Sequence, residues 1–152
     1  MQHEKWTRGL VMGMVWTEQL SVGNATLDSD NKKLFGLFDE LDRLTKAEEY
    51  YAVLRAFEQI NACMNQGFFN EKLFAQALNI SFEYHHITHQ NILADILFTK
   101  HDLKKGGVSG VCKIVQYAQF LRDWLIKHIN EDGHSMKQVL QTRPYDFKVD
   151  WA

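Results

Sequence analysis

The stretch FEYHHITHQNIL, residues 82–93, holds three of the chain's seven histidines within five positions. His85 and His89 are four residues apart, so on a helix they project from one face, one turn apart. Ile92 and Ile96 continue that face at helical spacing. The pattern therefore predicts a helix whose histidine face runs on into the hydrophobic core.

Three other segments show the same helical periodicity, and the only proline, Pro144, lies beyond all of them. The predicted long helices span residues 30–47, 48–78, 82–104 and 108–132, and a short one follows through Gln141. Long amphipathic helices joined by short connections predict an all-α fold, an antiparallel up-down-up-down four-helix bundle.

The bundle is predicted to occupy residues 16–141. Residues 1–15 form an N-terminal extension, and residues 142–152 form a C-terminal tail without helical periodicity. The aromatic residues of the tail are candidates for contacts with other molecules.

Capping residues set the expected helix ends. Asp28, Ser29 and Asp30 are the N-cap candidates of the first long helix. Asn79 and Gly133 are the expected stop signals of the second and fourth.

Composition excludes several classes of partner. The net charge is −2 and no basic block occurs, so nucleic-acid binding is not expected. No apolar run approaches the roughly 18 residues of a membrane span. Cys63 and Cys112 stand far apart with no CxxC motif, which favours reduced, buried thiols and a cytoplasmic protein.

The bundle topology brings polar residues of three helices to one end. In an antiparallel arrangement the start of the third helix lies beside the end of the fourth, and the end of the second lies at the same level. The residues expected to converge there are Glu71, His85, His89, His128 and Asp132.

A buried group of imidazoles and carboxylates needs a partner, because burying unpaired charge is costly. A divalent metal would satisfy all five side chains, and nitrogen and oxygen ligands suit Fe, Zn, Ni or Mn. Each residue alone also fits a plainer interpretation, as a solvated surface group or a hydrogen-bonded core histidine. The remaining histidines, expected to be exposed, are His3, His86, His101 and His134.

From about Trp16 to Asp132 the chain resembles bacterial hemerythrins. The segment WTEQLSVGNATLDSDNKKLF, residues 16–35, matches the opening Trp, the Ser-Val-Gly and the Asp-x-x-His-Lys signature of that family without a gap. Asn31, however, stands where the first iron-ligating histidine of the family belongs.

The other helices resemble the family in the same partial way. GFFNE, residues 67–71, keeps the bridging glutamate as Glu71 but has Gly67 in place of a histidine. The HxxxH motif of the family's third helix is kept as His85 and His89. In the fourth helix, DWLIKHINED, residues 123–132, keeps His128. Asp132 follows that histidine by four positions, whereas the family's aspartate follows by five.

The resemblance implies a carboxylate-bridged di-iron centre that binds O2, with both missing histidines belonging to one iron. This chain is therefore expected to hold one metal, or to bind metal with much reduced affinity. The metal is expected to be non-haem iron, or alternatively Zn or another divalent ion. A pocket is expected at Gly67 unless neighbouring side chains or water fill it. Cys63, one turn before Gly67, is expected to be core and not a ligand.

Two functional hypotheses follow. The first is a metal-dependent protein that binds or senses a small ligand, which could be O2, NO or an anion. The alternative is a metal-free pseudo-hemerythrin that acts as an interaction or signalling module. No feature of the sequence points to an organic substrate, so an enzyme is the less favoured expectation, and the oligomeric state is left open.

Overall fold

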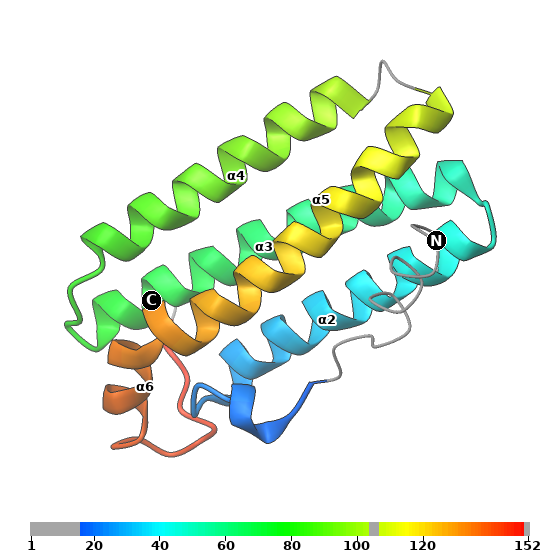
Figure 1. The fold of residues 1–152 in the computed structure, drawn as a ribbon. Helices are drawn as coiled ribbons and strands as arrows, with labels where there is room; N and C mark the ends of the chain where they lie inside the picture. The colour runs from blue at the N-terminus through cyan, green and yellow to red at the C-terminus, as the bar shows by residue number, and fades with distance from the viewer. Residues whose placement is uncertain (1–15, 104–106, 151–152) are drawn as a thin grey trace.

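The structure, a computed structural model, describes residues 16–103 and 107–150 (Figure 1). Within these ranges it is all-helical and contains no strand. A 3₁₀ turn, η1 (Glu18–Leu20), precedes the helices α2 (Ala25–Lys46), α3 (Tyr50–Ala77), α4 (Glu83–Leu103), α5 (Gly107–Lys127) and α6 (His134–Leu140). The segment between α5 and α6, η2 (His128–Asp132), is a π-helix. The extension expected at residues 1–15, with His3, and Trp151 of the tail lie outside the described residues.

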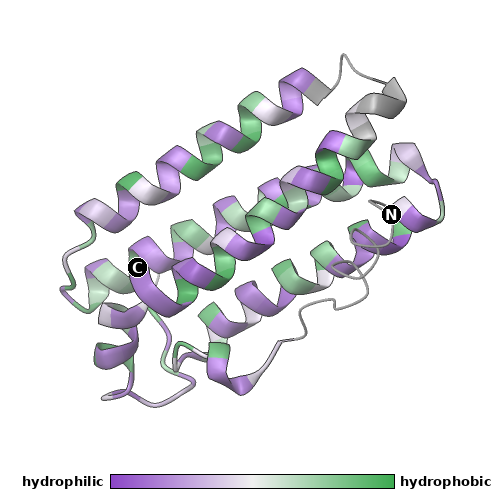
Figure 2. Ribbon diagram, viewed as in Figure 1, coloured by the Kyte–Doolittle hydropathy of each residue, from purple (hydrophilic) through white to green (hydrophobic). Residues whose placement is uncertain are grey.

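The four long helices lie side by side, and successive helices run in opposite directions (Figure 1). Polar and apolar residues are interspersed along each of them (Figure 2), as amphipathic packing requires. The fully buried side chains at the centre include Phe38, Phe57, Ile60, Ile96 and Leu121. This arrangement agrees with the predicted four-helix bundle.

The first long helix begins earlier than expected. Its N-cap is Asn24, whose Oδ1 accepts hydrogen bonds from the backbone N–H groups of Thr26 and Leu27. Asp28, predicted as a cap, is buried inside the helix and accepts from the backbone N–H of Val22 instead. The predicted caps at residues 28–30 are therefore wrong, because a side chain one turn upstream already satisfies the helix start.

Asn79 ends α3 as predicted. It adopts a left-handed conformation with φ of 58°. The backbone N–H of Ile80 bonds the carbonyl of Ala75, and that of Asn79 bonds the carbonyl of Gln76. These two bonds form a Schellman motif, which satisfies the last carbonyls of the helix.

The C-terminal tail packs against the start of α2. The Tyr145 hydroxyl donates to Asp28 Oδ2 at 2.9 Å, and the Asn24 amide donates to the Phe147 carbonyl at 2.8 Å. The Phe147 ring also meets Phe74 edge-on. The tail therefore covers the end of the molecule at which α3 ends and α4 begins.

One buried ion pair was not predicted. Arg122 on α5 donates to Asp42 on α2 at 2.9 Å, and both residues are buried. Burial raises the pKa of the Asp42 carboxyl, and the bond to Arg122 opposes this effect. The pair ties α2 to α5 across the core.

Both cysteines are free thiols, as predicted, but Cys63 is half-buried and Cys112 is exposed, so the expected burial is wrong for Cys112. No described helix has both the length and the apolar character needed to cross a membrane.

Candidate metal centre

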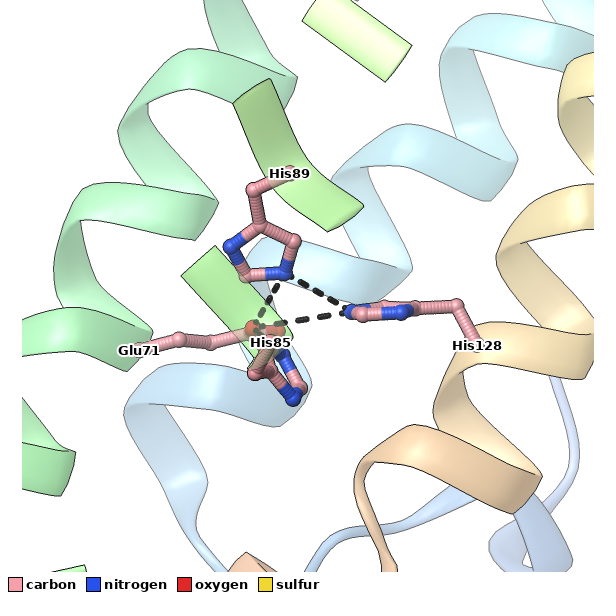
Figure 3. A group of neighbouring side chains, drawn as sticks. All are labelled: Glu71, His85, His89 and His128. Carbon is pink, nitrogen blue, oxygen red and sulfur yellow. Dashed lines mark hydrogen bonds and ion pairs between the residues drawn. The ribbon is translucent and has the colours of Figure 1, made fainter. Parts of the chain in front are cut away.

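Four of the five predicted site residues converge at one end of the molecule (Figure 3). Glu71 comes from α3, His85 and His89 from the first turns of α4, and His128 from the first residue of η2. One ligand atom of each lies within 4.8 Å of all the others. His89 and His128 are buried, and Glu71 and His85 are half-buried.

The distances between these atoms suit a shared cation. Glu71 Oε2 lies 2.9 Å from His85 Nε2 and 3.0 Å from His89 Nε2. His128 Nε2 lies 2.8 Å from His89 Nε2 and 3.8 Å from Glu71 Oε2. Two ligand atoms about 2.1 Å from one metal and at right angles to each other are about 3.0 Å apart.

Neighbouring groups fix which nitrogen of two imidazoles carries the proton. His85 Nδ1 lies 3.2 Å from the backbone carbonyl of Asp132, and His128 Nδ1 lies 3.0 Å from Asp132 Oδ2. A carbonyl and a carboxylate only accept, so each Nδ1 donates. Both neutral rings therefore present a bare Nε2 lone pair to the centre of the group.

The centre then holds more acceptors than protons. With all three imidazoles neutral, the one N–H available is that of His89, whose Nδ1 is buried without a partner among the described residues. His89 can donate that proton to His128 Nε2 or to Glu71 Oε2. In either case His85 Nε2 and Glu71 Oε2 remain two acceptors in contact with no proton between them. Either an added proton or a metal cation resolves this conflict.

Burial and mutual contacts shift the pKa values of Glu71, His89 and His128. Burial would raise the pKa of Glu71, but its bonds to the three imidazoles lower it well below its ordinary value. Burial lowers the pKa of His89 to about 4. Burial would also lower the pKa of His128, but Glu71 and Asp132 together raise it. The surroundings of His128 therefore favour its protonated form, in opposition to its burial.

Each imidazole is held against an aromatic ring. Phe68 stacks on His89 with centroids 3.7 Å apart, and Trp124 stacks on His128 at 4.6 Å. Phe82 stacks on His85 at 4.7 Å. The positions of Phe68 and Trp124 in the sequence give no signal of this positioning role.

Asp132 lies beside the group but is not one of the four converging side chains. Its carboxylate bonds Nδ1 of His128 and its carbonyl bonds Nδ1 of His85, so it orients both rings. Asp132 is the last residue of the π-helix, whose turns are wider than those of an α-helix. Its predicted role as a ligand itself stays a prediction.

Gly133 closes the π-helix and has no room for a side chain. Its N–H bonds the His128 carbonyl at 3.0 Å, and a Cβ added there would lie 2.7 Å from the Ile129 carbonyl oxygen. Gly133 ends this segment, as predicted. Its φ of −76° is not left-handed, so glycine is needed here because the Ile129 carbonyl leaves no room for a Cβ.

We expect Gly133→Ala to lower the free energy of unfolding by about 2 kcal/mol and to weaken metal binding, because the shifted backbone displaces His128 and Asp132. Thermal melts and zinc titrations would measure both effects. Gly36→Ala is the control, since a Cβ at Gly36 meets nothing within 4 Å. Equal stability of the two variants would contradict the role given to Gly133.

Asn31 and Gly67, which stand where the resemblance expects histidines, line one small cavity between α2 and α3. Asn31 is buried, and Gly67 faces α2 with Asp30 Cβ 3.7 Å from where its own Cβ would be. The pocket expected there is a cavity of only about 10 Å³. Cys63 does not line that cavity; it lies in a separate surface groove between α2 and α3.

The other described histidines lie outside the group. His101 and His134 are exposed, as predicted. The prediction was wrong for His86, which is half-buried and contacts the ring of Phe82.

No protein-family model matches the chain, and neither does any curated protein or solved structure.

Proposed function

We propose that this protein holds one divalent metal ion, in the first instance non-haem iron, and binds or senses O2 or a similar small ligand there. The supporting observation is the convergence of three Nε2 atoms and one carboxylate oxygen with too few protons to satisfy them. Imidazole and carboxylate ligands suit Fe, Zn, Mn and Ni. The resemblance to bacterial hemerythrins favours iron and a hemerythrin-like four-helix bundle, and we place the protein in the cytoplasm because its thiols are unpaired.

One metal per chain is expected because only one set of ligands is complete. The second position would need side chains at Asn31 and Gly67 that bind metal, and glycine supplies none. A cavity of about 10 Å³ also leaves no room for an imidazole from another element. Reversible O2 binding that draws one electron from each of two irons is therefore not available, and binding would depend on one metal.

Removing the metal should lower the melting temperature of the wild-type protein. A ligand that binds the folded state at a hundredfold excess over its Kd adds about 2.7 kcal/mol of stability. For a chain of this size that corresponds to roughly 5–10 °C. Thermal melts of zinc-loaded protein with and without a chelator would measure the shift.

His128→Ala serves as the control in that experiment. It should melt at a lower temperature than the wild type, and a chelator should not lower it further, because the metal is already lost. If a chelator removes metal from the wild type and the melting curve stays in place, the metal is not bound at a folded site.

A second candidate function, an interaction module, is favoured by the outer face of α4. Tyr84 is 75% exposed and Phe98 is 74% exposed. Ile87 and Leu97, which lie between them in the sequence, are each more than half exposed. Large apolar side chains on one exposed helix are a common feature of docking surfaces. Wild-type protein that takes up no metal, and whose melting temperature a chelator does not change, would favour this alternative.

A further inference from the structure

Helix α4 carries apolar side chains on two opposite faces. It lies at one edge of the bundle, packed on α3 and α5 (Figure 1). Its inner face runs from His89 to the buried residues Ile92 and Ile96. The outer face of a surface helix is ordinarily polar, whereas a helix that is apolar all round is covered all round. Within the described part of the chain nothing covers the outer face of α4.

The outer residues of α4 form a straight line along the helix. We call this line the α4 seam; its members are exposed and are Tyr84, Ile87, Asn91, Ala94 and Phe98. The intervals between them are three, four, three and four residues, the spacing by which two helices pack along their length. From end to end the seam is about 21 Å long.

The seam is symmetric about Asn91. Tyr84 lies seven residues before it and Phe98 lies seven residues after it. If two copies pack antiparallel about a two-fold axis at Asn91, Tyr84 of each copy meets Phe98 of the other. Ile87 and Ala94, four residues before and three after, then meet in the same way, a large side chain against a small one.

Asn91 favours a second copy over an unrelated apolar partner. Covering its amide with apolar groups is costly unless the amide is hydrogen-bonded. On a two-fold axis Asn91 faces the same residue of the other copy, and each amide N–H can donate to the other's carbonyl oxygen. A single asparagine in an otherwise apolar seam also fixes the register of paired helices.

The charges beside the seam favour the antiparallel direction. Glu83, Asp95 and His101 are all exposed. In a parallel pair Asp95 would lie beside Asp95 of the other copy, and like charges repel. An antiparallel pair separates these two carboxylates by about 12 Å along the helix and brings Glu83 of each copy toward His101 of the other.

We propose that this protein forms a two-fold symmetric dimer in which the α4 seams of two copies pack antiparallel. The inference rests on the interaction surface given above as the second candidate function and names its partner, a second copy of this chain. It requires no metal. The dimer would cover the helix whose inner face carries His85 and His89.

Sedimentation velocity of the wild-type protein tests the association. A short seam on one helix makes a small interface, so we expect a dimer with a Kd on the order of 10 µM. Samples from about 1 to about 200 µM should therefore pass from monomer to dimer. Wild-type protein that stays monomeric at the highest concentration overturns the proposal.

Charged substitutions test whether the seam is the interface. Ile87→Glu and Phe98→Glu each place a charge in the seam and should raise the Kd of the dimer at least about tenfold. Both side chains are exposed in the monomer, so dilute samples of the variants should melt as the wild type does. Tyr51→Glu, on α3 and 83% exposed, is the control and should dimerise like the wild type. An unchanged Kd in Phe98→Glu overturns the seam.

Cross-linking tests the position of the two-fold axis. In a background of Cys63→Ala and Cys112→Ser, Asn91→Cys should form a covalent dimer on mild oxidation. Ser29→Cys, exposed on α2, is the matched control and should stay uncross-linked. A dimer that forms in solution without this Asn91→Cys cross-link places the interface elsewhere and overturns the proposal.

The direction of the helices is tested in the same background. A mixture of Glu83→Cys and His101→Cys proteins should give mixed covalent dimers, identified by mass. Glu83→Cys alone should give none. Efficient cross-linking of Glu83→Cys to itself would show a parallel pair and overturn the antiparallel arrangement.

Metal content measured on the same samples separates this proposal from the metal centre. A monomer that holds one metal ion overturns the dimer and leaves the metal centre standing. A dimer that takes up no metal overturns the metal centre and supports α4 as an interaction surface.

Discussion

Replacing His89 with alanine should abolish stoichiometric metal binding and lower the free energy of unfolding by about 3 kcal/mol or more. Its Nε2 lies 2.8 Å from His128 Nε2 and 3.0 Å from Glu71 Oε2, so no other side chain can take its place. The ring is buried and stacks on Phe68 at 3.7 Å, so its removal also leaves a cavity in the core. Elemental analysis and chemical denaturation would measure the two effects.

Two further variants separate the metal from the packing. His89→Phe keeps a ring against Phe68 but has no nitrogen, so it should lose the metal with a smaller loss of packing. His86→Ala, on the same helix but outside the group, should keep its metal. Metal retained by His89→Phe at the wild-type level would show that the ion is held elsewhere.

Metal affinity should fall by about a hundredfold or more as the pH is lowered from 8 to 5, since a proton and the metal compete for the same Nε2 atoms. His128 is the main competitor, because Glu71 and Asp132 raise its pKa against the effect of burial. Zinc titrations at pH 5, 6, 7 and 8 would show the trend. An affinity independent of pH would exclude imidazole ligands.

The stability of the metal-free protein should pass through a maximum over the same range. The pKa of His89 is lowered to about 4 in the folded state, so its neutral form contributes about 3 kcal/mol that is lost as the pH falls from about 6.5 toward 4. The lowered pKa of Glu71 acts in the same direction, at lower pH. The pKa of His128 is raised, so its contribution is present in acid and is lost as the pH rises through that pKa.

A bound metal should prevent the loss of stability that the metal-free protein shows as the pH rises through the pKa of His128, because the metal takes the place of the proton on that ring. The difference in melting temperature between zinc-loaded and metal-free protein should therefore grow from pH 5 to pH 8. A difference that is largest at pH 5 would contradict the proposed ligand set.

Helical periodicity was enough to predict the long helices and the convergence of the site. His85 and His89 share a face because they are four residues apart, and the alternating direction of the helices brings them to His128 and Glu71. These are consequences of a repeat of 3.6 residues per turn, which a sequence displays directly.

Features that depend on contacts distant in sequence were not predicted. Asp132 lies in a π-helix, a rare conformation without a reliable sequence signal, and its carbonyl contacts His85, which is distant in the sequence. The C-terminal tail packs on α2 through Tyr145 and Phe147, which show no periodicity. The cavity beside Gly67 has a volume of only about 10 Å³, and the close approach of α2 to α3 at that point is not specified by the sequence.

The most direct test is the metal content of the wild-type protein. Metal-free protein is equilibrated anaerobically with excess Fe²⁺, and separately with Zn²⁺, freed of loosely bound ions and subjected to elemental analysis. The ligand set of Glu71, His85, His89 and His128 predicts about one ion per chain in each case. Two ions per chain, or none, would contradict it.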